Sequence, residues 1–413
     1  MTHDTVDNDG GGDTSPHMDT LAVHAGRFPT VLNAPSSPPL FQASSYEFDD
    51  LEEVEAIYGG TRPGAIYGRY GGPNAVHFAG AMAALEGAED AVGAASGMAA
   101  IGAALATASA PGEPIVHADA LYGGTATLLE NDFQQRGNRL VSFDPTDPDA
   151  LAEVLQRHRA RVVYVEALSN PLMRVADLPG LADVAHHHDA VLIVDATFAT
   201  PALLRPLALG ADLVLHSVGK YLGGHGDVGA GVVAGRGALI EPIRRYLVRN
   251  GATIPHFEAW LALRGLRTLA LRMERISANA SAIAAYLAQA DGVLRVHHPS
   301  RTEHPEHALA RRLYPRGTGG IVAFDLDGGR SAVDAFLRGL ETIAIVHSLG
   351  EVATTISYSA ASSHRPLAPE ARRALGITDG TLRLSCGIED VRDLLTDLAR
   401  AFAGVPSSAP ASG

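Results

Sequence analysis

Two short apolar runs decide the fold class: Arg161-Val-Val-Tyr-Val-Glu166 and Ala190-Val-Leu-Ile-Val-Asp195. Each run is continuously apolar between its polar ends, which is the pattern of a strand buried on both faces of a parallel sheet. Between them, residues 178–190 show a helical pattern, as the crossover between two parallel strands requires. The sequence therefore predicts an α/β domain built on a doubly wound, mostly parallel sheet.

The same alternation of strands and helices continues over residues 71–265, which predicts one large α/β domain. A proline-rich stretch, residues 18–70, precedes it and predicts an extended N-terminal arm. Residues 266–403 mix strands and helices less regularly and predict a smaller α+β domain. The two ends of the chain, residues 1–17 and 404–413, are polar or rich in Pro, Ser and Ala, and we expect disordered tails there.

The smaller domain is entered through a long helical pattern, residues 256–290. Beyond it, short apolar runs predict strands, and apolar residues at helical spacing predict helices. The predicted strands are 320–326, 342–346 and 381–385, and the predicted helices are 331–339 and 389–403.

The composition disfavours several classes of partner. The chain has 413 residues and a formal net charge of −14, which disfavours binding to nucleic acid or to an anionic membrane surface. No apolar run is long enough to span a bilayer. Cys386 is the one cysteine, so no intrachain disulfide can form, and we expect a cytoplasmic protein.

Lys220 is the only lysine of the chain, since the remaining residues among the 32 Lys and Arg are arginines. Arginine serves wherever only a positive charge is needed. It does not lose its proton to become a nucleophilic amine, as lysine does when its pKa is lowered. Lys220 is therefore a candidate for amine chemistry, above all for a Schiff base. The alternative is a lysine that lies on a solvated loop.

The neighbours of Lys220 favour a ligand site. The apolar run Leu213 to Leu215 predicts a buried strand, which Ser217 and Gly219 end. A loop with three glycines between residues 223 and 226 follows, so the backbone there can approach a ligand closely. A strand end beside such a loop is where α/β folds bind ligands, whereas a lysine on a solvated loop needs none of these neighbours.

Asp195 ends the predicted strand 191–194, at the edge of the sheet where ligands bind. If the ligand is pyridoxal phosphate, an acid is needed opposite the pyridine nitrogen, because it keeps that nitrogen protonated and lets the ring take up carbanion charge. The alternative is that Asp195 caps the turn that follows it.

A phosphate site is the second requirement of such a ligand. Ala95-Ser96-Gly97-Met98 precedes an Ala-rich helical run that ends at Ala110. The N-terminus of a helix binds phosphate through its free N–H groups, and Ser217 could add a hydroxyl. The alternative is that Ser96 is an ordinary N-cap.

Two further side chains point to a ligand. Tyr122 lies between a strand-like segment and a helical one, where its ring could stack on a cofactor; the alternative is a core position. Arg383 interrupts the apolar run 381–385, and a buried guanidinium needs an anionic partner. A substrate α-carboxylate, held by two hydrogen bonds, is the natural candidate. The alternatives are an internal ion pair or an edge position.

Two patterns suggest other chemistry. Gly224-His-Gly-Asp-Val-Gly229 matches G-x-G-x-x-G, but the dinucleotide fingerprint needs a helix directly after it, and residues 230–235 predict a strand. A nucleotide-binding oxidoreductase stays a remote alternative. His186-His187-His188 suggests a metal, but consecutive histidines on a helix point in different directions, so we expect no metal site.

Taken together, these segments resemble the pyridoxal-phosphate-dependent enzymes of cysteine and methionine metabolism. That family includes cystathionine γ-synthases, cystathionine γ- and β-lyases, methionine γ-lyases and O-acylhomoserine sulfhydrylases. The resemblance covers about residues 18–403, and it is the set of short motifs in this order that is specific. The motifs are Tyr67-Gly-Arg69, Ala95-Ser-Gly-Met98, Leu121-Tyr-Gly123, Ser169-Asn-Pro171, Val194-Asp195, His216-Ser217 with Lys220, Gly223-Gly-His-Gly-Asp227, Leu263-Arg-Gly-Leu266 and Arg383-Leu-Ser385.

The resemblance implies a fold-type I enzyme with pyridoxal 5'-phosphate as its cofactor. Lys220 would form the Schiff base, Asp195 would pair with the pyridine nitrogen, and Tyr122 would join Lys220 in catalysis. The resemblance also implies a homotetramer, a dimer of dimers, in which Tyr67 and Arg69 reach the phosphate of the neighbouring subunit. The implied cofactor contacts are Tyr67, Arg69, Ser96, Gly97, Met98, Tyr122, Asn170, Asp195, Thr197, Ser217 and Lys220.

The implied partner is a small amino-acid substrate. The predicted reaction is γ-elimination or γ-replacement on a sulfur-containing or O-activated homoserine-type amino acid, with a thiol as a candidate second substrate. A β-lyase and a fold-type I aminotransferase are the alternatives. The implied substrate contacts are Arg383, Asn170, Ser348 and His347.

The sequence departs from the family pattern at several positions. Gly219 stands where Thr is usual, Ala196 where Asn is usual, and Gly124 where methionine γ-lyases carry a reactive Cys. His347 takes the place of a Glu found in enzymes that act on cystathionine and of a small apolar residue in methionine γ-lyases. It could contact the distal end of a substrate; the alternative is that it packs at the pocket rim.

Overall fold

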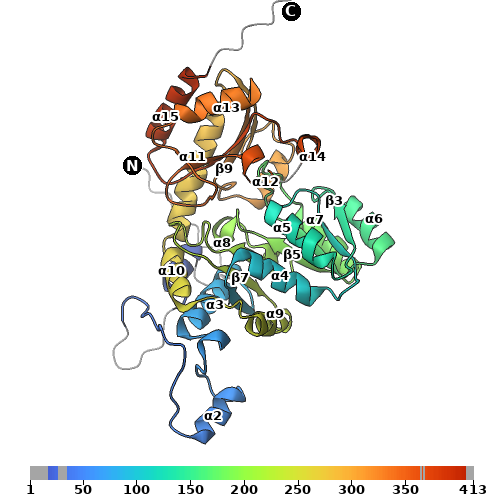
Figure 1. Cartoon of the computed structure of the whole chain (residues 1–413), viewed down its shortest axis with the longest axis vertical. Helices are drawn as coiled ribbons and strands as arrows, with labels where there is room; N and C mark the ends of the chain where they lie inside the picture. Colours follow the sequence, from blue (N-terminus) through green and yellow to red (C-terminus); the bar gives the residue numbers. More distant parts are fainter. Residues whose placement is uncertain (1–16, 27–34, 363–364, 366–367, 406–413) are drawn as a thin grey trace, which may run out of the picture.

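Two β-sheets organise the computed structural model of the chain (Figure 1). Within the described residues, the first sheet has seven strands in the order β1-β7-β6-β5-β4-β2-β3, and only β7 runs antiparallel to its neighbours. The second has five strands in the order β10-β11-β12-β9-β8. The strands are β1 (Asp90–Ala94), β2 (Ile115–Ala118), β3 (Leu140–Phe143), β4 (Val162–Glu166), β5 (Val191–Asp195), β6 (Leu213–Ser217), β7 (Gly231–Gly235), β8 (Val293–His297), β9 (Ile321–Leu326), β10 (Ala344–Ile345), β11 (Thr355–Tyr358) and β12 (Thr381–Ser385).

The structure describes residues 17–26, 35–362, 365 and 368–405. The expected disordered tails therefore lie almost wholly outside the described residues. The helices are α1 (Met18–His24), α2 (Leu51–Tyr58), α3 (Pro73–Glu86), α4 (Gly97–Ala108), α5 (Gly123–Leu128), α6 (Pro148–His158), α7 (Leu178–His187), α8 (Thr200–Leu203), α9 (Gly237–Asn250), α10 (His256–Leu266), α11 (Leu269–Leu287), α12 (His307–Leu313), α13 (Gly329–Arg338), α14 (Pro369–Ala374) and α15 (Val391–Ala403). None of these helices is both long and apolar enough to cross a membrane.

The predicted α/β class with a mostly parallel sheet is confirmed. Strands β4 and β5 pair in parallel, from Val162 opposite Val191 to Glu166 opposite Asp195, and α7 connects them. All of β4 and the centre of β5 are buried, because helices cover both faces of the sheet. The smaller second sheet carries α13 and α15 on its outer side (Figure 1).

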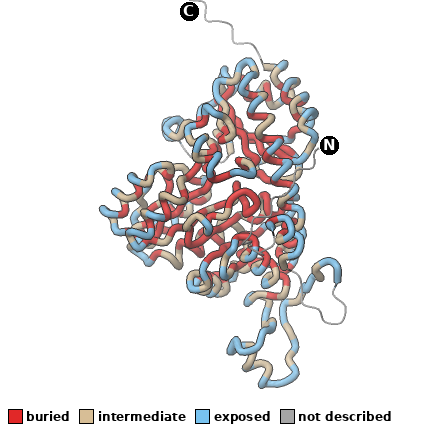
Figure 2. The backbone as a smooth tube through the Cα atoms, turned by 180° about the vertical axis from the view of Figure 1, so that it is seen from behind, coloured by how far each residue is buried: buried red, intermediate tan, exposed pale blue. Residues whose placement is uncertain are grey.

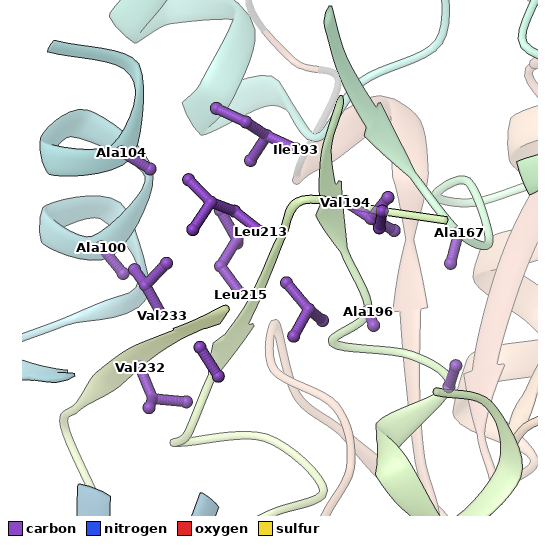
Figure 3. Packing of buried hydrophobic residues seen from close by; sticks show 14 of the residues in the cluster. Ala100, Ala104, Ala167, Ile193, Val194, Ala196, Leu213, Leu215, Val232 and Val233 are labelled. Carbon is purple, nitrogen blue, oxygen red and sulfur yellow. The ribbon is translucent and has the colours of Figure 1, made fainter. Parts of the chain in front are cut away.

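Helix α4 packs directly on the large sheet. Figure 3 shows Ala100 and Ala104 of α4 facing Leu213 of β6 and Val233 of β7. Alanine has almost no side chain beyond Cβ, so an Ala-rich helix can lie close to the branched residues of the strands. This packing fixes the N-terminus of α4 beside the end of β6.

The predicted helix 256–290 is wrong as one element, because the structure has two helices, α10 and α11. Gly265 packs against the carbonyl oxygens of Leu222 and Gly223, which an added Cβ would approach to 2.7 and 2.5 Å. This approach fixes the end of α10 against the loop after β6. The buried residues of α11 then divide between two apolar clusters, one under each sheet.

Two other expectations differ from the structure in extent. The predicted strand 342–346 is reduced to the two residues of β10, an exposed edge strand beside β11. The first part of the expected arm is packed, since α1 buries Met18 and Ala22 in the core of the large domain. The rest of the described arm, residues 35–70, leads away from the body and is mostly exposed (Figures 1 and 2).

Candidate active site

One cavity of about 660 Å³ gathers most of the sequence-predicted site residues. It lies at the carboxyl ends of β4, β5 and β6 and is also lined by residues of the smaller domain. Of the predicted residues, only Tyr67, Arg69 and Ser348 are absent from its wall. The wall consists of Ser96, Gly97, Met98, Ile101, Tyr122, Glu166, Leu168, Asn170, Asp195, Thr197, Phe198, Ser217, Lys220, His347, Leu349, Ala361, Ser362, Arg365 and Arg383.

Lys220 lies on the turn that follows β6, where its N–H donates to the carbonyl of Ser217. Its Nζ donates to Ser348 Oγ at 3.0 Å. Burial lowers the pKa of the Lys220 amine, and the positive charge of Arg383 lowers it further. Both effects favour the neutral amine, which is the nucleophilic form.

The N-terminus of α4 and the end of β6 form one end of the cavity. A Cβ added at Gly97 would lie 2.8 Å from Ser217 Cβ, so only glycine allows this approach. Ser96 does cap α4, because its Oγ accepts from Ala99 N at 3.0 Å, and it lines the cavity as well. Thr197 Oγ1 accepts from Ser217 N at 2.9 Å. Free N–H groups and two hydroxyls at a helix N-terminus suit a phosphate.

Asp195 lies on the cavity wall at the end of β5. Its Oδ1 accepts from Thr197 N at 2.9 Å, and its Oδ2 accepts from Tyr164 Oη at 3.3 Å. The capping alternative therefore holds for one oxygen, while the carboxyl as a whole still faces the ligand space. Burial raises the pKa of Asp195, and the hydrogen bonds of Thr197 and the charge of His216 oppose that rise.

Arg383 lies in β12, between β11 and β9, and is 5% exposed. Its Nη1 donates to Asn170 Oδ1 and its Nη2 to the carbonyl of Ser348, both at 3.1 Å. Its Nε has no partner, and no carboxylate among the described residues pairs with it. The edge-strand alternative is wrong and the ion-pair alternative finds no support in the described part of the chain. A buried cation with an unused donor is suited to an anionic ligand.

Tyr122 directly precedes α5 and is 44% exposed. Its ring lines the cavity, so the core alternative is wrong for this residue. Gly124 lies beneath that ring, since an added Cβ there would lie 2.5 Å from Tyr122 Cε1. The glycine at 124 therefore leaves the space that the ring occupies.

Tyr67 and Arg69 lie on the arm, away from the cavity of this chain. Arg69 Nη1 donates to the carbonyl of Val248 at 3.0 Å, and its guanidinium lies 4.7 Å from the centroid of the Tyr70 ring. His347, by contrast, is exposed on the cavity wall.

The departure at Gly219 has a local cause. A Cβ at this position would collide with the carbonyl oxygen of Val228. The hydroxyl-bearing residue that the family resemblance would place there cannot be accommodated unless the loop between β6 and β7 moves.

The two patterns that suggested other chemistry have structural explanations. Gly224–Gly229 connects β6 to β7, and no helix follows it, so the dinucleotide fingerprint is absent. His186 pairs with Asp212 at 3.1 Å. In the described residues, no group of three or more His, Cys, Asp or Glu side chains is placed to hold a metal ion.

Several wall residues were not singled out from the sequence. Glu166 ends β4 just as Asp195 ends β5, so the strand-end argument applied to Asp195 would also have identified it. Leu168, Phe198 and Leu349 carry no such signal, because apolar residues near strand ends look like ordinary core.

The wall as a whole fits pyridoxal phosphate. A helix N-terminus with Ser217 offers a phosphate cradle, Asp195 offers an acid for a pyridine nitrogen, and Lys220 lies on the same wall. The exposed ring of Tyr122 can cover one face of an aromatic ligand. Arg383 lies on the same wall and has no carboxylate partner among the described residues, so it can take the carboxylate of a ligand.

Comparisons with known proteins agree with this fit. Residues 19–403 match the family of Cys/Met metabolism PLP-dependent enzymes. The O-succinylhomoserine sulfhydrylase of Pseudomonas aeruginosa is 40% identical over 388 residues, which cover 94% of this chain and 96% of that protein. The L-methionine gamma-lyase of Pseudomonas putida is 38% identical over 394 residues, which cover 95% of this chain and 98% of that protein.

Solved structures show the same relationship. Cystathionine gamma synthase from Xanthomonas oryzae pv. oryzae, in complex with cystathionine, matches with a TM-score of 0.89 at 38% identity, covering 94% of this chain and 98% of that one. A Campylobacter jejuni structure that contains N'-pyridoxyl-lysine-5'-monophosphate matches with a TM-score of 0.89 at 28% identity, covering 94% and 99%. The chain belongs to the Cys/Met metabolism family of pyridoxal-phosphate-dependent enzymes.

Proposed function

We propose that this enzyme acts at the γ-carbon of an O-acylated homoserine, where the sulfur of a thiol replaces the acyloxy group and that group leaves as a carboxylate. The observation that carries the proposal is the meeting of Lys220, Asp195 and Arg383 in one cavity. The names of its relatives, which include an O-succinylhomoserine sulfhydrylase and cystathionine gamma-synthase, support the choice of substrate. When bound, pyridoxal phosphate supplies an electron sink for negative charge at the α-carbon of an amino acid.

Each predicted cofactor contact has a place in this proposal. Lys220 would hold the cofactor through its amine until the substrate amine takes its place, and Asp195 would keep a proton on the ring nitrogen. The N-terminus of α4 and hydroxyls at the end of β6 would hold the phosphate, and Asn170 would contact the ring oxygen. The residues assigned to the phosphate are Ser96, Gly97, Met98, Thr197 and Ser217.

Lys220 also moves the protons. Its Nζ takes the α-proton of the substrate, and its lowered pKa leaves it unprotonated for that step. Ser348 Oγ orients the amine, while Arg383 holds the substrate α-carboxylate in a two-pronged hydrogen bond. Lys220 Nζ then takes a proton from the β-carbon, and the Tyr122 hydroxyl assists departure of the acyloxy group from the γ-carbon as a carboxylate. The thiol sulfur bonds the γ-carbon, the thiol proton is lost to the departing carboxylate, and the β- and α-carbons regain their protons.

γ-Elimination, which releases a 2-oxo acid and ammonia, is the second candidate because L-methionine gamma-lyases are among the relatives. Gly124 supports replacement over that reaction. A side chain at 124 would meet the Tyr122 ring, so the reactive cysteine that the resemblance associates with methionine γ-lyases would fit here only if that ring shifted.

A substrate panel tests the proposal. The purified protein with pyridoxal phosphate is given O-succinylhomoserine, O-acetylhomoserine, cystathionine and methionine, each with and without a thiol. We expect a sulfur-containing amino acid only when an O-acylhomoserine and the thiol are both present. Release of 2-oxobutyrate and ammonia at the same rate with and without the thiol would assign the enzyme to elimination. Products formed only with a keto-acid acceptor, and no ammonia, would assign it to transamination.

Lys220→Ala is the sharpest variant for this test, and we expect it to abolish turnover. Since Lys220 is the only lysine, no other ε-amino group of the chain can replace it. An alanine variant with the wild-type rate of turnover would contradict the proposed function.

We also infer a cytoplasmic homotetramer whose active sites are shared across a dimer. Support comes from the exposed apolar residues of the arm, such as Leu51 and Tyr58, which are 79% and 61% exposed. Tyr67 and Arg69 lie outside the cavity of their own chain, so they are available to a neighbouring one. The unpaired Cys386 suits a reducing compartment.

Mixing two inactive variants tests the shared site. Lys220→Ala and Arg69→Ala are unfolded, mixed and refolded together, and mixed oligomers are verified by mass spectrometry. If Arg69 serves the neighbouring subunit, some sites in mixed oligomers have both residues intact, and activity returns. Verified mixed oligomers without activity would contradict the shared site.

A further inference from the structure

Glu166 and Asp195 lie side by side on the cavity wall. They are opposite each other in the parallel pairing of β4 and β5, and both line the cavity. Side chains at paired positions of neighbouring parallel strands project from the same face of the sheet. The wall therefore presents two adjacent carboxyl groups.

Main-chain groups of Tyr122 and Asn170 form hydrogen bonds with Glu166. The main-chain N–H of Tyr122 donates to its Oε1 at 2.6 Å, and the residue is only 8% exposed. Among the described residues, neither Glu166 nor Asp195 forms an ion pair. Two negative charges this close, without a cation in contact, are strongly disfavoured in a buried site.

The surroundings decide which of the two keeps its proton. Asp195 accepts hydrogen bonds from Thr197 and Tyr164, and the charge of His216 also favours its ionised form. Burial, and then the neighbouring Asp195, raise the pKa of Glu166 to about 8, although the backbone hydrogen bonds of Tyr122 and Asn170 to Glu166 oppose that rise. The negative charge of the pair thus belongs on Asp195 and the proton on Glu166.

We propose that Glu166 is a positioning residue that stays protonated in the working enzyme, where it fixes the main chain at Tyr122 and leaves the negative charge of the pair on Asp195. The proposal rests on the proposed function in one respect only: Asp195 is taken to pair with the ring nitrogen of the cofactor, and Tyr122 to cover the face of its ring. Glu166 itself transfers no proton to the substrate.

Loss of the Glu166 proton changes the total charge of the cavity. Ionised Glu166 would place a second negative charge in a space that must admit the substrate α-carboxylate, so substrate binding weakens as the pH rises through about 8. The ionisable groups that face the pair or share the cavity wall with it are Tyr164 from β4, Tyr122 before α5, His216 from β6, Lys220 after β6, His347, Arg365 and Arg383 from β12.

Infrared spectroscopy of the holoenzyme and of the cofactor-free protein tests the proton directly. A protonated carboxyl has a C=O stretch separate from that of a carboxylate. We expect the difference spectrum between wild type and Glu166→Gln to contain this band near neutral pH and to lose it above about pH 8. Glu153→Gln, at an exposed position of α6, is the matched control and should leave the band intact.

Steady-state kinetics test the positioning role. The amide of Glu166→Gln mimics a protonated carboxyl, so near neutral pH we expect it to retain far more activity than Glu166→Asp. The aspartate variant cannot reach Tyr122 N and should lose about tenfold or more in kcat/KM. Above about pH 8, KM should rise in the wild type and in Glu153→Gln but stay flat in Glu166→Gln.

Two results would overturn the proposal. One is the absence of the carboxylic-acid band near neutral pH. The other is a loss of about a hundredfold or more in Glu166→Gln, which would mean that Glu166 works ionised. The spectra need no turnover, so they still decide the question if the panel of acylhomoserines gives no product.

Discussion

Two buried arginines in different regions of the molecule show how a structural cation differs from one kept for a ligand. Arg272, at the corner between α10 and α11, is 4% exposed, and Arg383, at the cavity, is 5% exposed. Burial lowers the pKa of each to about 10. Neither has a carboxylate partner among the described residues. Residue type, burial and charge therefore do not separate them.

Their hydrogen bonds do separate them. Arg272 donates to the carbonyls of Tyr221, Leu222 and Gly265 and to Thr268 Oγ1, at 2.5 to 3.2 Å. Arg383 has two protein acceptors, one for each of its terminal nitrogens, and its Nε has none. A buried guanidinium whose nitrogens all donate to protein acceptors stabilises the fold. A buried guanidinium with an unused nitrogen lacks an acceptor, and a substrate can supply one.

The largest effect is expected for Arg383→Met. Loss of two charge-assisted hydrogen bonds to a substrate carboxylate should lower kcat/KM by about a thousandfold, mainly through KM. The thermal unfolding temperature should stay close to that of the wild type, since few protein partners are lost. Steady-state kinetics and calorimetry measure the two, and a loss below about tenfold would refute the assignment.

Arg272→Met should lower the stability of the protein much more than its activity, the opposite of Arg383→Met. Three carbonyls lose their donor, so the free energy of unfolding should fall by about 3 kcal/mol. Activity per folded molecule should change much less than in Arg383→Met. Denaturant unfolding of both variants provides the comparison, and equal destabilisation of the two would remove the distinction between them.

A third effect reaches the lysine. The charge of Arg383 contributes to the lowered pKa of Lys220, so Arg383→Met should raise that pKa. Amine labelling of the cofactor-free protein, followed by mass spectrometry, should then show its midpoint at higher pH than in the wild type. Lys220 is the only lysine, so the labelled peptide is unambiguous. A midpoint unchanged by Arg383→Met would show that the two charges are screened from each other.

The smallest effect is expected for Ser348→Ala. This change removes the hydroxyl that accepts from Lys220 Nζ but keeps the carbonyl that accepts from Arg383. One neutral acceptor is worth about 1 kcal/mol, so kcat/KM should fall by about tenfold or less. A loss as large as that of Arg383→Met would make Ser348 part of the carboxylate site.

The parallel sheet and much of the cavity could be predicted from the sequence because they rest on local patterns. The apolar runs that end at Glu166 and Asp195, and the lone Lys220 after another run, follow from strand periodicity and from the rule that ligands bind at strand ends. Arg383 could be predicted because a charge within an apolar strand is conspicuous. The family resemblance supplied the reaction class.

The remaining features depend on contacts between distant segments. The break between α10 and α11 lies beside the close approach of Gly265 to the loop after Lys220, a contact that no local pattern encodes. The burial of α1 depends on its packing against α3 and α11. The position of Phe198 on the cavity wall likewise follows only from the folded chain.

Helix α11 also connects the two domains mechanically. Its first half is anchored in the core of the large domain and its second half in that of the small one, while Arg272 ties it to the two carbonyls that follow Lys220. Any tilt of the small domain, which carries Arg383, would pull on that loop. A movement of Arg383 on binding a carboxylate would therefore be transmitted through α11 and Arg272 to the loop that carries the Lys220 amine.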